Sequence, residues 1–152
     1  MAGHRAWTRP LLLAAAVLLA VAALGGVLAL RSGGGGGGSE LAQVLGAPDA
    51  VAVQLRGARP GTLRVVYSNE QDRAVLVGSG LDDPGADRTY QLWAIEGSSP
   101  TSAGVFTPAT SGSVDQAVDA PSGSPRAWGV TIEPRGGSPA PTGEILYQGT
   151  PA

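Results

Sequence analysis

The chain has 152 residues, which is enough for one domain of ordinary size but not for two. Its formal charge of −2 gives no basic face for nucleic acid. It contains no cysteine and no lysine, and its only histidine is His4. This composition excludes disulfides, thiolate chemistry and a histidine-based metal site in the body of the chain.

Residues 11–30 form an apolar stretch without a charge or a proline. At about 1.5 Å per residue, a helix of this length spans the roughly 30 Å hydrocarbon core of a bilayer. Arg5 and Arg9 precede the stretch, whereas only Arg31 follows it directly, so the positive-inside rule places the N-terminus in the cytoplasm. We predict a cytoplasmic stub over 1–10, a transmembrane helix over 11–30, and a single-pass protein of the cell membrane whose C-terminal domain is extracytoplasmic.

A cleavable signal peptide is the alternative interpretation of this stretch. The apolar run exceeds the usual length of about 7–15 residues, which favours a retained anchor. No small-x-small cleavage site follows its end, although cleavage after Ala22 stays open. Both interpretations place the rest of the chain outside the cytoplasm.

Residues 31–48 are predicted to be a Gly-rich linker with a short juxtamembrane helix. The SGGGGGGS run over 32–39 lacks the lysine of a phosphate-binding loop, and its composition is typical of a flexible tether. Ser39 can cap a helix that reaches Leu45, and Glu40 suits the positive end of its dipole. Gly46 and Pro48 would end that helix.

From residue 49 onward, apolar residues recur with a period of two, which is typical of strands. Strands are predicted over 51–56, 63–68, 73–79, 89–96, 104–106, 114–118, 126–133 and 144–148. Residues 89–96 are apolar on both faces, which favours a central strand. Turn signals such as Asp82-Asp83-Pro84-Gly85 separate the runs. We expect an all-β fold over 49–152, an Ig-like β-sandwich of about seven or eight short antiparallel strands preceded by the transmembrane helix.

The side chains of this domain do not supply a catalytic site. Without His, Cys or Lys beyond residue 4, a Ser-His-Asp triad, a Cys-His pair and a Ser-Lys dyad are all impossible. Glu96, Glu133 and Glu144 lie at strand ends, where we expect them to face water and not to form a glycosidase pair. The acidic turn over 82–87 lacks the alternating ligands of a calcium loop. We therefore predict no enzyme, no metal and no cofactor.

Six aromatic side chains could form either a binding patch or the core of the domain. In a domain of this size the core is the favoured interpretation. They are Tyr67, Tyr90, Trp93, Phe106, Trp128 and Tyr147.

Three stretches of the domain form an ordered set of motifs, made of Tyr90, Gln91, Leu92, Trp93, Gly104, Val105, Phe106, Thr131, Glu133, Pro134, Gly136, Gly137, Pro141, Thr142 and Gly143. Together these motifs resemble the C-terminal domain of the anti-sigma-K factor family. The resemblance covers about residues 40–149, and its motifs are specific as an ordered set. We interpret them as structural and not as catalytic.

The resemblance implies a role in the regulation of transcription. In that family a cytoplasmic N-terminal domain holds an extracytoplasmic-function sigma factor inactive, and the C-terminal domain lies outside the membrane. Proteolysis outside and then inside the membrane releases the sigma factor. Only about ten residues precede the apolar stretch here, too few for the sigma-binding helices, so we expect the anchoring and sensing part of such a regulator.

The expected partners are the membrane, an envelope protease and the sigma-factor pathway, without nucleic acid and without an evident small-molecule substrate. The alternative function is a non-catalytic binding module of the cell envelope that has no sigma factor partner. A purely structural envelope protein is the third interpretation.

Overall fold

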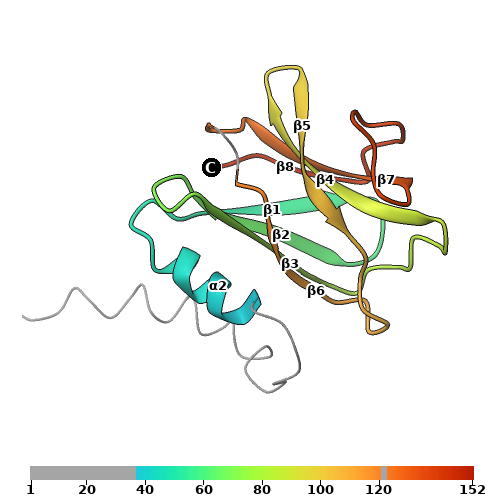
Figure 1. Cartoon of the computed structure of the whole chain (residues 1–152), viewed down its shortest axis with the longest axis horizontal. Helices are drawn as coiled ribbons and strands as arrows, with labels where there is room; N and C mark the ends of the chain where they lie inside the picture. The colour runs from blue at the N-terminus through green and yellow to red at the C-terminus, as the bar shows by residue number, and fades with distance from the viewer. Residues whose placement is uncertain (1–36, 121–122) are drawn as a thin grey trace, which may run out of the picture. The chain divides into compact units, whose positions relative to one another are not determined.

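The computed structural model of the chain describes residues 37–120 and 123–152 (Figure 1). The predicted stub, the predicted transmembrane helix over 11–30 and most of the Gly-rich run lie outside these residues. Within the described part, no helix is long and apolar enough to cross a membrane. The elements are α2 (Gly37–Leu45), β1 (Val51–Gly57), β2 (Thr62–Ser68), β3 (Arg73–Ser79), β4 (Arg88–Glu96), β5 (Ser99–Phe106), β6 (Val114–Val118), β7 (Ala127–Pro134) and β8 (Tyr147–Gly149).

The eight strands form one antiparallel ladder in the order β5-β4-β7-β8-β1-β2-β3-β6. The strand β1 joins its two halves, because residues 51–55 pair with β2 whereas Arg56 and Gly57 pair with β8. The prediction of a mostly β domain with seven or eight antiparallel strands is confirmed. The expected Ig-like sandwich has two separate sheets, whereas here the shared strand makes the sheet continuous.

The end strands β5 and β6 approach each other and nearly close this sheet. The backbone N–H of Asp119, just after β6, donates a 2.9 Å hydrogen bond to the carbonyl of Ala103. The side-chain amide of Gln116 donates to the carbonyl of Val105 at 3.1 Å. These bonds cover part of the backbone of β5, which would otherwise be an open edge.

The main core lies between the two halves of the sheet. The rings of Tyr67 on β2 and Trp128 on β7 meet across it with centroids 5.6 Å apart, and Tyr90 stacks on Phe106 at 5.2 Å. Five of the six aromatic residues belong to this core, as predicted. Its buried members are Val53, Leu55, Leu63, Val65, Tyr67, Ala74, Leu76, Leu81, Tyr90, Leu92, Ala94, Ala103, Phe106, Val114, Trp128, Val130 and Tyr147.

A second, smaller apolar cluster lies under α2 on the outer side of the first half of the sheet. Val44 of the helix is fully buried there against Val66 of β2 and Val75 of β3. Leu41 and Val77 pack against these three residues. The helix therefore belongs to the same compact unit as the strands, and it packs on β2, β3 and β6 (Figure 1).

Candidate functional site

The strands β4 and β7 turn a row of side chains away from the main core. Because side chains alternate along a strand, the core positions of Leu92 and Val130 place Trp93 and Thr131 on the outer face. These outer side chains are nevertheless buried, with Trp93 at 1% and Thr131 at 0% exposure. The loop over 135–146, which connects β7 and β8, bonds to two further residues of β4 and β7, Gln91 and Glu133.

Glu133 is the centre of this arrangement, and its carboxylate accepts four hydrogen bonds. Thr131 Oγ1 donates at 2.6 Å and Ser138 Oγ at 2.9 Å. The backbone N–H of Thr142 donates at 2.9 Å, and the hydroxyl of the same residue donates to the second carboxylate oxygen. The expectation that Glu133 faces water is therefore wrong, because its side chain is 0% exposed and bound by the loop.

The surroundings of Glu133 favour its ionised form. Burial alone would raise the pKa of this carboxyl, but the hydrogen bonds from Thr131, Thr142 and Ser138 outweigh it and lower the pKa from 4.5 to about 2. All four donors are neutral, so the negative charge is stabilised by hydrogen bonds. The carboxylate keeps its charge at neutral pH and needs these donors to do so.

Trp93 and Gln91 extend this network across β4. The indole N–H of Trp93 donates to Thr131 Oγ1 at 2.9 Å. Gln91 accepts from the backbone N–H of Ser138 at 2.8 Å and donates to its carbonyl at 3.0 Å. Its amide also donates to Ser102 Oγ on β5 at 2.8 Å. The 135–146 loop is thus hydrogen-bonded to side chains of two strands, to Glu133 of β7 and to Gln91 of β4, and Gln91 in turn bonds to β5.

Gly137 allows the loop to approach this closely. Its φ of +85° lies in the left-handed region, where a side chain is strained. A Cβ atom here would stand 2.7 Å from Val105 Cγ1 and 2.8 Å from Gln91 Oε1. Only glycine therefore fits this position without a shift of its neighbours.

The structure separates the fifteen motif residues into groups with different surroundings. Three of them, Tyr90, Leu92 and Phe106, belong to the main core. Those in or against the Glu133 network are Gln91, Trp93, Thr131, Glu133, Gly137 and Thr142. The others lie on β5, at the end of β7 or in the 135–146 loop, and they are Gly104, Val105, Pro134, Gly136, Pro141 and Gly143.

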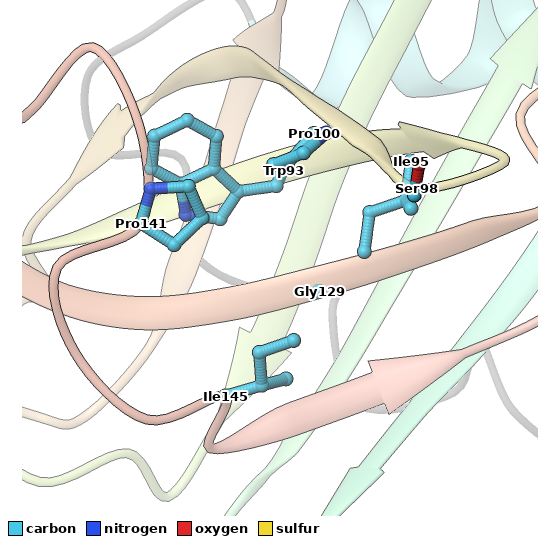
Figure 2. Close-up of a pocket in the computed structure, with 7 residues that line it drawn as sticks. All are labelled: Trp93, Ile95, Ser98, Pro100, Gly129, Pro141 and Ile145. Atoms are coloured by element: carbon cyan, nitrogen blue, oxygen red, sulfur yellow. The ribbon is translucent and has the colours of Figure 1, made fainter.

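An apolar groove, which was not predicted from the sequence, adjoins the network on the same outer face. It has a volume of about 180 Å³. Figure 2 shows Trp93 and Pro141 together on one side and Ile95 and Ser98 on the other. Its lining residues are Trp93, Ile95, Ser98, Pro100, Gly129, Pro141 and Ile145. Gly129 is the residue that could have indicated the groove. It has no side chain, and it lies opposite Trp93 on the neighbouring strand β4.

The three glutamates singled out in the sequence have different surroundings. Glu96 and Glu144 are exposed, whereas Glu133 is buried and fully engaged by hydrogen bonds. Within the described residues, no three His, Cys, Asp or Glu side chains gather as metal ligands. The groove is smaller than the roughly 300–1,000 Å³ typical of small-molecule pockets. The fold and this site define a small all-β domain whose buried polar network fixes a surface loop.

The comparisons with known proteins place this domain in a family. Residues 11–145 match the family model described as "Anti-sigma-K factor rskA, C-terminal". The match covers most of the chain, so the chain belongs to this family, and the resemblance noted in its motifs is confirmed.

Curated relatives agree with this assignment. A Streptomyces griseus protein described as "Uncharacterized protein in phr 5'region" is 41% identical over 108 residues, which are 68% of this chain and 43% of the relative. Anti-sigma-K factor RskA of Mycobacterium tuberculosis is 36% identical over 112 residues, 70% of this chain and 46% of the relative. The same factor of Mycobacterium ulcerans is 34% identical over 106 residues, covering 70% and 45%. The chain spans less than half the length of these relatives, and no solved structure matches it.

Proposed function

We propose that this chain forms the anchoring and sensing part of a membrane-bound anti-sigma-K regulator, with its β domain outside the cytoplasm. The observation that carries the proposal is the extent of the family match. It begins at residue 11, where the apolar stretch begins, and it ends at residue 145, close to β8. The matched region therefore spans the predicted anchor, α2 and the strands from β1 to β7.

The proposed topology rests on the charges beside the apolar stretch. Arg5 and Arg9 lie before it and would stay in the cytoplasm, while the chain from Arg31 onward would be exported. In this arrangement residues 31–36 connect the bilayer to α2. An envelope protease would reach the chain in this region, and a sigma factor would be the final target of the pathway.

The folded domain would control that proteolysis. A protease needs an extended backbone, whereas strands and helices keep theirs hydrogen-bonded and partly buried. The domain also carries few exposed large apolar side chains, which is typical of a stably folded body. A signal that loosened the domain would thus expose the chain near the membrane and start the release of the sigma factor.

Turnover of a core variant in cells tests this proposal. Trp128 is 0% exposed in the main core, and Trp128→Ala should cost about 3–5 kcal/mol of stability. A pulse-chase experiment should then show the anchored form disappearing several-fold faster. The matched control is Arg126→Ala, one residue before β7 and exposed, which should leave the half-life unchanged. An unchanged half-life in a Trp128→Ala protein shown to be unfolded would refute the gating function.

The groove beside Trp93 favours a second candidate function, the cell-envelope binding module without a sigma factor partner. Depletion of the protein separates the two candidates. The regulator predicts that transcripts of one sigma-factor regulon change when the protein is depleted. The binding module predicts that this regulon stays at its normal level.

A further inference from the structure

The helix α2 is attached to the domain by an apolar cluster that is separate from the main core. Val44 is its only fully buried apolar residue, and it contacts Val66 and Val75 of the sheet. Leu41 packs against the edge of this cluster. The main core lies on the opposite face of β2 and β3, where Val65 and Leu76 point. Removal of the helix would therefore leave the main core intact.

The helix cannot persist once it leaves the sheet. It has nine residues, of which the first two are Gly37 and Gly38. Isolated helices shorter than about 12–15 residues are marginal in water. Undocking would therefore also melt α2, so docking and helix formation make one cooperative step.

The salt bridge of α2 resists this step only weakly. Glu40 and Arg73 form a salt bridge of 3.8 Å with both side chains partly exposed, and such pairs contribute little in water. A firmer attachment follows the helix, where Asp49 accepts hydrogen bonds from Ser68 Oγ and from the backbone N–H of Glu70. An opening that begins at the N-terminal end would thus stop at Asp49.

We propose that α2 is a latch that opens as a local unit while the eight strands stay folded, and that this opening exposes residues 41–48 to proteolysis. The second half of the statement rests on the proposed function, because that function supplies the protease. The first half is a property of the folded chain alone. The opening of α2 would then limit the rate of cleavage.

Two measurements on the purified full chain in non-ionic detergent test the latch. Hydrogen exchange should show that the amides of α2 exchange at least tenfold faster than those of β2 and β3, which need a larger opening. Thermolysin, which cuts before bulky apolar residues, should cleave between residues 40 and 45 while residues 49–152 stay intact.

Variants on both sides of the contact should speed this cleavage. Val44→Ala removes two buried methyl groups and should raise the cleavage rate roughly tenfold. Alanine is a better helix former than valine, so a faster rate has to come from lost packing. Val75→Ala on β3 should act in the same direction. The control is Gln43→Ala on the exposed side of α2, which should not raise the rate.

Exchange of α2 only together with the strands would overturn the latch, and so would an unchanged cleavage rate in both valine variants. These measurements involve no cell, so their failure leaves the proposed function standing. Unchanged turnover of unfolded Trp128→Ala protein in cells refutes the proposed function and leaves the latch standing.

Discussion

The hydroxyl of Thr131 donates a 2.6 Å hydrogen bond to the carboxylate of Glu133 on the outer face of β7. A hydroxyl has a single hydrogen, so toward the Trp93 indole 2.9 Å away Thr131 acts as the acceptor. The hydrogen bonds are therefore donated in one direction, from the Trp93 indole to Thr131 and from Thr131 to the Glu133 carboxylate. The 135–146 loop closes the network from the other side through Ser138 and Thr142.

The first prediction concerns these two consecutive hydrogen bonds of Thr131. Thr131→Val keeps the shape of the side chain, but it leaves the Trp93 N–H without an acceptor and removes one donor from Glu133. We expect a loss of about 2–4 kcal/mol in the free energy of unfolding, measured by urea denaturation of the full chain in detergent. Thr101→Val on the exposed side of β5 is the control and should change the stability by less than about 0.5 kcal/mol. Equal stabilities of the two variants would show that the hydrogen bonds of Thr131 do not stabilise the domain.

The stability of the domain should depend on pH through Glu133. Its pKa is about 2 in the folded chain and near 4.5 when unfolded, so the unfolded chain binds the proton more readily. The stabilisation is full above pH 4.5 and is lost as the pH falls from there toward 2, by at most roughly 3 kcal/mol. Hydrogen bonds from Ser68 and Glu70 lower the pKa of Asp49 and act in the same direction.

The variant Glu133→Gln isolates the contribution of this carboxylate. It should be less stable than the native chain at pH 7, because the amide cannot accept four hydrogen bonds. Its stability should also fall less between pH 5 and pH 3, as followed by circular dichroism in urea. The exposed Glu144→Gln variant should behave like the native chain at each pH. The same loss on acidification in Glu133→Gln as in the native chain would show that another group carries the pH dependence.

The two buried tryptophans allow the hydrogen bond of Trp93 to be measured separately from packing. Both are nearly fully buried, but within the described residues the Trp128 N–H has no hydrogen-bond partner, whereas Trp93 donates to Thr131. Replacement by phenylalanine removes the same atoms at both sites. We expect Trp93→Phe to cost about 1 kcal/mol more than Trp128→Phe in thermal or urea unfolding. A larger cost for Trp128→Phe would mean that packing alone decides.

Two neighbouring glycines separate backbone strain from steric exclusion. Gly136 and Gly137 both have positive φ, +93° and +85°, but a Cβ at Gly136 meets nothing within 4 Å. Gly136→Ala should therefore cost about 1 kcal/mol for strain alone. Gly137→Ala should cost clearly more, because its Cβ would stand 2.7 Å from Val105. Equal costs in urea denaturation would show that the loop shifts easily and that the network does not fix it.

The sequence predicted most strands because their apolar residues alternate. The strand β3 and the strand β6 have the bounds that were expected, and the two-sided apolar pattern of β4 correctly placed it between two neighbours. The strand β5 is longer than the predicted 104–106, because Pro100 lies on the outer edge of the sheet and needs no ladder hydrogen bond. Local pattern was sufficient to predict β3, β4 and β6.

The candidate site was less predictable because its partners are distant in the sequence. Glu133 was expected in water, and only its place among the family motifs pointed to more. Its burial depends on Ser138 and Thr142 in a loop that periodicity does not describe. The predicted strand over 144–148 was wrong at its start for the same reason. β8 begins at Tyr147, because the preceding residues belong to the loop that covers β7.

The most direct test of the whole account is the position of the β domain relative to the membrane. Protease added to intact spheroplasts should remove a C-terminal tag from the full chain, while a tag placed before residue 11 should stay protected until the membrane is dissolved. The protein should also sediment with the membrane fraction. A soluble cytosolic product whose C-terminal tag is protected from the added protease would contradict the account.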